Sequence, residues 1–296
     1  MGRIPYHRLP TERANPRSRA LGRLHPGAIA RLMNRADREA VKAVGRAAPA
    51  IGRAVTAIVE RLARGGRLIF AGAGTSGRLG VLEAAECPPT FNTRPGQVQA
   101  VMAGGRRAVF RSVEGAEDDA RGGARAIRAR RGDAVVGIAA SGVTPFVLAA
   151  LGEARRRGAL TVLLTCNPSV PRRAAHIVIA LEVGPEVLAG STRLKAGTAT
   201  KLTLNTLTTA AFTRLGKVHG NRMVDLQPKS AKLRARAERL VRDLGGVSAA
   251  RAGKLLEQAR GSAKVAVVMA RRRVTAAEAR RRLRAAAGFL GPAAGI

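Results

Sequence analysis

Two turns of this chain combine hydroxyl side chains with glycine, and that combination is suited to binding phosphate or sugar oxygens. The first turn occupies residues 72–77 and the second residues 140–145, each directly after a short apolar run. Backbone N–H groups at the start of a following helix would add hydrogen-bond donors. The candidate binding residues are Gly74, Thr75, Ser76, Gly77, Ser141, Gly142 and Thr144. For either turn alone, serines and threonines that merely cap helices are an equally good interpretation.

The first turn matches the G-x-G-x-x-G pattern of dinucleotide-binding proteins, but the rest of that signature is missing. The signature expects an acidic residue about 20 residues further on, where it binds the ribose hydroxyls. Residues 97–105 occupy that region and contain no acidic side chain. Two hydroxyl-bearing turns therefore fit a small phosphorylated sugar better than a dinucleotide.

Alternating strand and helix patterns must position these turns. The predicted strands are residues 67–71, 133–139, 159–165 and 176–180, and the predicted helices are 27–64, 78–86, 146–157 and 195–215. Thr144 and Pro145 fit the N-cap and the first position of the third helix, and Pro88 and Pro89 are expected to end the second helix at Glu86. This α/β order predicts a doubly wound parallel sheet with helices on both faces and both turns at the carboxyl ends of its strands.

The remaining chain is predicted to be helical. After residue 225 the pattern stays helical to the end, with a helix start at Ser248 and a capping box at residues 275–278. We therefore expect an N-terminal helical segment at residues 1–57, a sheet domain at residues 58–221 and a small helical module at residues 222–296.

The chain is strongly basic, with 53 Lys and Arg against 19 Asp and Glu and a formal net charge of +34. Such charge ordinarily favours a nucleic-acid partner. However, six Phe, one Tyr and no Trp leave few stacking platforms, and no zinc-finger spacing is present. Because only eight of the basic residues are lysine and the excess runs along the whole chain, a compositional background explains it better, and specific nucleic-acid binding is not expected.

Several classes of protein are excluded by what the sequence lacks. The two cysteines, Cys87 and Cys166, are far apart and indicate neither a disulfide framework nor a zinc site, which fits a reducing cytoplasm. No run approaches the length of a membrane-spanning helix, and the first 16 residues lack the apolar stretch of a secretory signal. We expect a cytoplasmic protein with no membrane association.

Further motifs lie along nearly the whole chain: residues 11–16, 72–80, 86–90, 113–118, 137–142, 166–168, 184–187, 190–201 and 220–225. In sequence and order they resemble the SIS phosphosugar-binding family, and within it the N-acetylmuramic acid 6-phosphate etherases, relatives of the animal glucokinase regulatory protein. The resemblance implies an SIS-type sheet domain, a UBA-like C-terminal module and a homodimer. It also implies cleavage of a lactyl ether of a phosphorylated amino sugar by elimination and water addition, with no metal or other cofactor.

Glu86 and Glu117 match the two catalytic positions of that family. The resemblance makes Glu117 the base at carbon 2, while Glu86 protonates the leaving lactate and deprotonates the incoming water. Carboxyl groups in different environments can divide such roles. The alternative from the residues alone is that Glu86 is a solvated carboxylate at a helix end, and that residues 114–119 form an acidic first helical turn.

The resemblance also suggests Lys195 as a charge partner of the substrate, although a surface helix lysine is an equally good interpretation. Val143 stands where the family usually has arginine, which puts a polar contact beside the second turn in doubt. Another function class stays open, because a non-catalytic phosphosugar-sensing regulatory protein could share this fold.

Overall fold

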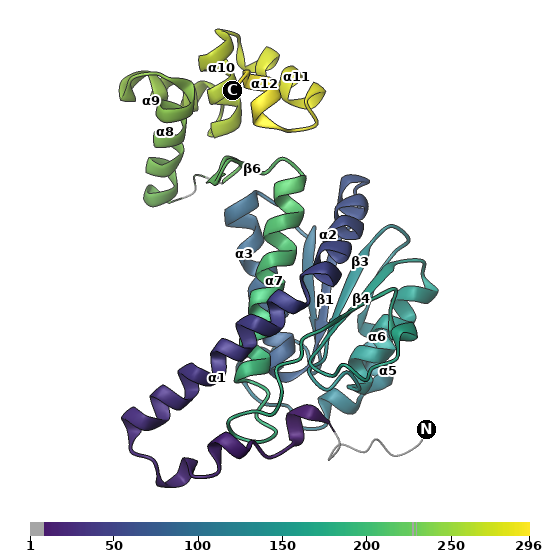
Figure 1. Ribbon diagram of the computed structural model, residues 1–296. Helices are drawn as coiled ribbons and strands as arrows, with labels where there is room; N and C mark the ends of the chain where they lie inside the picture. Colours follow the sequence, from purple (N-terminus) through teal and green to yellow (C-terminus); the bar gives the residue numbers. More distant parts are fainter. Residues whose placement is uncertain (1–8, 227, 229) are drawn as a thin grey trace. The chain divides into compact units, whose positions relative to one another are not determined.

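The computed structural model describes residues 9–226, 228 and 230–296, and it divides into two compact units (Figure 1). The first unit contains the described residues up to Ala84 together with Gly96–Leu207, and the second contains Ala85–Pro95 and Thr208–Ile296. Residues 1–8, which include half of the stretch examined for a secretory signal, lie outside the described residues. The domain boundaries at residues 57 and 221 stay predictions.

A five-stranded parallel sheet forms the centre of the first unit. Its strands are β1 (Leu68–Gly72), β2 (Val98–Met102), β3 (Ala134–Ile138), β4 (Leu160–Thr165) and β5 (Ile177–Ala180), in the order β2-β1-β3-β4-β5. Every residue of β1, β3 and β4 is buried, as expected for parallel strands covered on both faces. The α/β fold and the four predicted strands are thereby confirmed within one or two residues.

The first unit also holds most of the longer helices, and α3 and α7 run on into the second unit. The α-helices are α1 (Pro26–Arg46), α2 (Ala48–Ala63), α3 (Gly74–Phe91), α4 (Arg107–Phe110), α5 (Ala120–Ala126), α6 (Pro145–Arg156) and α7 (Lys195–Arg214). Short 3-10 turns are η2 (Pro10–Glu12), η3 (Pro16–Ser18), η4 (Leu21–Arg23), η5 (Ala116–Asp118) and η6 (Arg172–Ala174). The helical run predicted at 27–64 forms as two helices that meet at Ala47, with Pro49 in the first turn of the second.

Helix α3 differs from the prediction at both ends. It begins at Gly74, so most of the glycine-rich turn forms its first turn, and it continues to Phe91 with Pro88 and Pro89 inside it. The expectation that the prolines end the helix at Glu86 is therefore wrong. The fixed φ of proline is compatible with a helix. The two prolines remove two backbone hydrogen bonds from the end of α3, but the backbone keeps its helical conformation.

Helices cover both faces of the sheet (Figure 1). Helix α6 packs on β1, β3 and β4, and α2 packs on β4 and β5. Apolar residues of α6 and of the sheet share one buried cluster, which includes Phe146, Leu151, Ile69, Val135 and Leu163. Burial of this apolar surface is the main stabilising contribution in the unit, and it holds the strand ends that carry the two turns.

The C-terminal part of the second unit is helical, as predicted. A two-stranded hairpin, β6 (Val218–His219) with β7 (Arg222–Met223), precedes α8 (Ala231–Gly245), α9 (Ala249–Gln258), α10 (Ala263–Arg272), α11 (Ala276–Ala285) and α12 (Leu290–Ala294). The side chains of Ser248 and Thr275 cap α9 and α11, which confirms both predicted helix starts. Within the described residues, no helix is long and apolar enough to cross a membrane.

Candidate functional site

The two predicted turns meet at one edge of the sheet. Strands β1 and β3 are parallel neighbours whose register pairs Gly72 with Ile138, so both turns leave the sheet at the same level. A cavity of about 360 Å³ lies at this edge. It is lined by Thr11, Glu12, Ala73, Gly74, Thr75, Ser76, Glu117, Asp118, Ile138, Ala139, Ala140, Ser141, Thr144, Pro145, Gly190 and Thr192. Five of the predicted binding residues and one predicted catalytic residue thus lie around the same space.

The glycines of the first turn allow β1 and α3 to pack closely. A Cβ atom on Gly72 would lie 2.7 Å from the backbone N of Gly77, and one on Gly77 would lie 2.7 Å from the backbone O of Gly72. Neither position has room for a side chain. This close packing places Thr75 and Ser76 in the first turn of α3, where free N–H groups and the helix dipole favour an anion.

The second turn is held by side chains that follow β4. Asn167 donates its Nδ2 to the backbone O of Ser141 at 3.0 Å, and the Thr165 hydroxyl donates to Ala140 O at 3.2 Å. The Thr165 Oγ1 also accepts the backbone N–H of Asn167 at 3.1 Å. Thr165 and Asn167 therefore hold the second turn in position, although they lie more than 20 residues away in the sequence.

The turn hydroxyls are largely free of capping bonds. Thr144 occupies the N-cap position of α6, as predicted, but its side chain makes no cap hydrogen bond. Its Oγ1 lies 3.4 Å from the Oγ of Ser141, which accepts the backbone N–H of Val143 at 3.3 Å. Among the described residues the hydroxyls of Thr75 and Ser76 have no hydrogen-bond partner. Helix capping therefore does not account for these side chains, and they can donate to or accept from a ligand.

The acidic residues of the cluster at 114–119 have two different roles in the structure. Asp119 caps α5 by accepting the backbone N–H of Gly122 at 2.7 Å, as the helix-turn alternative expected for this part of the cluster. Glu117 and Asp118 lie in η5 and line the cavity. Glu117 also lines a smaller adjoining hollow of about 160 Å³ together with Arg78. An exposed carboxylate between two hollows is placed to exchange a proton with a bound molecule.

Glu86 belongs to the part of α3 that the second unit contains. Its side chain is exposed, and the helix continues beyond it. The exposed side chain fits the alternative of a solvated carboxylate, but the expected place at the helix end is wrong, since five further residues of α3 follow Glu86. Its catalytic role stays a prediction.

Lys195 is not the surface helix lysine that the alternative proposed. The residue is 5% exposed, and its Nζ donates to the backbone O of Val183 at 2.6 Å. The fully buried Glu186 accepts the backbone N–H groups of Lys195 at 3.0 Å and Ala196 at 2.9 Å. Burial lowers the pKa of Lys195 and raises the pKa of Glu186. These contacts fix the start of α7, and a contact of Lys195 with substrate stays a prediction.

Four residues that line the cavity lie outside the predicted strands, the two turns and the acidic cluster, and no role was predicted for them from the sequence: Thr11, Glu12, Gly190 and Thr192. Their side chains or backbones reach the cavity from segments on either side of the sheet region in sequence. The only signal in the sequence was that residues 11–16 and 190–201 match the family motifs.

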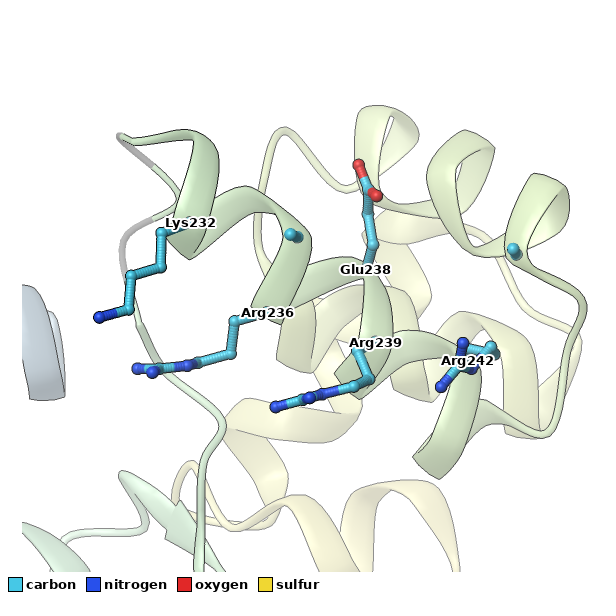
Figure 2. Close-up of a pocket in the computed structure, with 7 residues that line it drawn as sticks. Lys232, Arg236, Glu238, Arg239 and Arg242 are labelled. Atoms are coloured by element: carbon cyan, nitrogen blue, oxygen red, sulfur yellow. The ribbon is translucent and has the colours of Figure 1, made fainter.

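A basic hollow lies on the second unit (Figure 2). Lys232, Arg236, Arg239 and Arg242 line an open hollow on α8, and Figure 2 shows Lys232, Arg236 and Arg239 projecting from the same side of the helix. These residues recur at the spacing of the solvent-facing side of an amphipathic helix. The hollow has no hydroxyl-bearing turn. Within the described residues, no group of three or more His, Cys, Asp and Glu could hold a metal ion.

Known proteins resemble the chain over nearly its full length. Two family models match it, the glucokinase regulatory protein N-terminal SIS domain at residues 50–155 and the SIS domain at residues 111–210. An N-acetylmuramic acid 6-phosphate etherase of Geobacillus thermodenitrificans is 47% identical and covers 95% of this chain and 97% of the relative. Those of Rubrobacter xylanophilus and Symbiobacterium thermophilum are each 51% identical. They cover 97% and 90% of this chain and 96% and 89% of their own lengths.

Proposed function

Because the chain belongs to the N-acetylmuramic acid 6-phosphate etherase family, we propose that it cleaves the D-lactyl ether of N-acetylmuramic acid 6-phosphate. The products are D-lactate and N-acetylglucosamine 6-phosphate. One observation supports the choice of residues for this reaction. Glu117 and the two hydroxyl-bearing turns line the same cavity at one edge of the sheet.

The phosphate group would bind where the two helices begin. The hydroxyls of Thr75, Ser76, Ser141 and Thr144 line the cavity at the N-termini of α3 and α6. Helix N-termini offer free N–H donors and the positive end of the helix dipole, which stabilise a phosphate. Gly74 also lines the cavity, whereas Gly77 and Gly142 shape the two turns. The positive charge of the chain would in addition favour the approach of an anionic substrate.

In the first half of the reaction, Glu117 would accept the proton at carbon 2 of the sugar. The electron pair of that C–H bond then forms a double bond between carbons 2 and 3, and the bond from carbon 3 to the lactyl oxygen breaks. Glu86 donates a proton to the departing oxygen, so that lactate leaves with its ether oxygen.

In the second half, water adds to carbon 3. Glu86 removes a proton from the water and Glu117 returns one to carbon 2, so that both carboxyl groups end in their starting states. One water is consumed for each lactate released. Side chains that transfer protons in this way contribute about a hundredfold to ten-thousandfold each.

Release of D-lactate by the purified protein tests this function. We expect the unmodified chain to release lactate, and Glu117→Gln and Glu86→Gln each to reduce kcat at least about a hundredfold. Glu60→Gln is the matched control, since Glu60 is an exposed carboxylate on α2, and no residue of α2 lines the cavity. Full activity in both Glu117→Gln and Glu86→Gln would exclude the assigned roles.

A non-catalytic phosphosugar-sensing protein is the second candidate function. It is favoured by the match of residues 50–155 to the glucokinase regulatory protein model. A sensor would be stabilised against thermal unfolding by a sugar phosphate and would release no lactate. The same lactate assay, run beside a thermal-shift titration with N-acetylglucosamine 6-phosphate, distinguishes the two functions.

We also propose that the chain acts as a cytoplasmic homodimer in the recycling of peptidoglycan sugars. The dimer and the recycling role rest on the family resemblance. The cytoplasmic location rests on the small number of cysteines, two that lie far apart in the sequence, which suits a reducing compartment. Sedimentation velocity of the full chain would show the dimer as a species of twice the 30.9 kDa chain mass.

A further inference from the structure

One wall of the cavity comes from the segment near the N-terminus. Thr11 and Glu12, in η2, line the same space as Ser76 and Glu117. They are the first two residues of the motif at residues 11–16, which the reaction described above does not use. Because they line the cavity, Thr11 and Glu12 are candidates for contact with the substrate.

Hydrogen bonds fix this wall to the loop that precedes α7. The backbone O of Thr11 accepts the N–H of Gly190 at 2.9 Å, and Asn15 donates its Nδ2 to Pro185 O at 3.2 Å. A Cβ atom on Gly190 would lie 2.9 Å from Oε2 of Glu12, so the carboxylate rests directly against this glycine. The position of Glu12 is therefore defined by its surroundings, although its side chain is exposed.

The side chains of Thr11 and Glu12 form no hydrogen bonds with the rest of the described residues. The hydroxyl of Thr11 is buried and has no hydrogen-bond partner among the described residues, and Thr11 is 1% exposed. In the part of the chain that the structure describes, the Glu12 carboxylate likewise forms no ion pair or hydrogen bond. This is notable in a chain with 53 basic residues. A buried polar group without a partner costs free energy, which a ligand that supplies the missing bond would recover.

We infer that Glu12 binds a hydrogen-bond donor on the sugar ring of the substrate, a hydroxyl or the amide N–H, and so determines how the sugar lies in the cavity. The inference rests on the proposed function for the identity of the sugar. An ionised carboxylate only accepts hydrogen bonds and repels the phosphate and the lactyl carboxylate. With the phosphate bound by the hydroxyls at the starts of α3 and α6, Glu12 would direct the donor-bearing part of the ring toward the wall that Thr11 and Glu12 form.

The test compares two probes that share phosphate and differ in the sugar. Isothermal titration calorimetry would measure binding of N-acetylglucosamine 6-phosphate and of inorganic phosphate to the full chain and to Glu12→Ala. We expect Glu12→Ala to weaken binding of the sugar phosphate about tenfold to a hundredfold, the range of one hydrogen bond to a charged group. Binding of inorganic phosphate should stay unchanged or become tighter, because one negative charge is removed.

Two variants and a kinetic measurement complete the test. Glu12→Gln keeps an acceptor oxygen and should lie between Glu12→Ala and the unmodified chain, while Glu60→Ala should match the unmodified chain. In the lactate assay, Glu12→Ala should raise KM by a similar factor and change kcat less than about threefold. Melting temperatures within a degree or two of the unmodified chain would show that the fold is intact.

Equal weakening for both probes, or no weakening for either, would overturn the assignment of Glu12. Failure of the proposed function looks different. If the unmodified chain releases no lactate but binds the sugar phosphate in a way that depends on Glu12, the etherase activity is wrong and Glu12 still recognises the sugar.

Discussion

Gly142 should tolerate alanine poorly for two separable reasons. Its φ of +74° lies in the left-handed region, where a Cβ atom costs about 1 to 2 kcal/mol. A Cβ atom there would also overlap Cγ2 of Val170 and lie 2.8 Å from Oγ1 of Thr165. Overpacking in a close-packed region costs about 1 to 3 kcal/mol. We therefore expect Gly142→Ala to lower the free energy of unfolding by about 2 to 5 kcal/mol.

Gly65→Ala separates the two terms. Gly65 has a similar φ of +82°, but a Cβ atom there would meet nothing within 4 Å, so only the backbone cost of about 1 to 2 kcal/mol applies. Urea unfolding at pH 7 would give both values. In the lactate assay, Gly142→Ala should lose at least about tenfold in kcat/KM, because displaced atoms at Thr165 move the turn that carries Ser141. Gly65→Ala should keep full activity. Equal stability losses in the two variants would refute the packing argument.

Three further predictions concern charges and a thiol that do not line the cavity. Burial raises the pKa of Asp133, but hydrogen bonds from Arg67 and from backbone N–H groups outweigh it and hold the pKa below its ordinary value of 3.8. Asp133 should therefore stabilise the fold at neutral pH and lose this contribution as the pH falls below about 4. Urea unfolding would measure this, because the difference in stability between Asp133→Asn and the unmodified chain should become smaller below that pH. Asp225→Asn should cost about 3 kcal/mol in the same assay because the buried Lys264 ammonium loses its partner, and adding Lys264→Met should restore part of it. Burial, with the nearby Glu186 charge, raises the pKa of Cys166 to about 12, so iodoacetamide should label this thiol in unfolded but not in folded protein at pH 8, as mass spectrometry would show.

The sheet edge could be predicted from the sequence because it depends on local patterns. Short apolar runs followed by glycine and hydroxyl residues gave β1 and β3, and parallel pairing placed their turns together. The structural reason for glycine at positions 72 and 77 could not be predicted in the same way. Gly72 and Gly77 are required because they touch each other, and that contact appears only when β1 packs against α3.

Long-range contacts account for what the sequence did not predict. Lys195 has the polar character of a surface residue, and its burial depends on Val183 and Glu186, which lie outside its own helix. Thr11 and Glu12 join the cavity because residues 11–15 form hydrogen bonds with Pro185 and Gly190, far along the chain. Neither contact leaves a periodic pattern in the sequence, so only the three-dimensional arrangement shows them.

The strength of proline as a helix terminator was overestimated. Pro88 and Pro89 were expected to stop α3 at Glu86, yet the helix runs to Phe91. Proline excludes a hydrogen bond but not the helical dihedral angle, so it can occupy a last turn that is held by other contacts. One such contact is the Thr90 hydroxyl, which donates to the backbone O of Glu86 at 2.9 Å.

The central claim is that this chain cleaves the lactyl ether by elimination and water addition, and the path of the oxygen tests it most directly. N-acetylmuramic acid 6-phosphate would be converted by the purified chain in water enriched in heavy oxygen, and both products would be weighed by mass spectrometry. The account predicts label in N-acetylglucosamine 6-phosphate, at the carbon 3 hydroxyl, and unlabelled D-lactate. Label in the lactate would contradict cleavage at carbon 3, and the absence of lactate would contradict the etherase function itself.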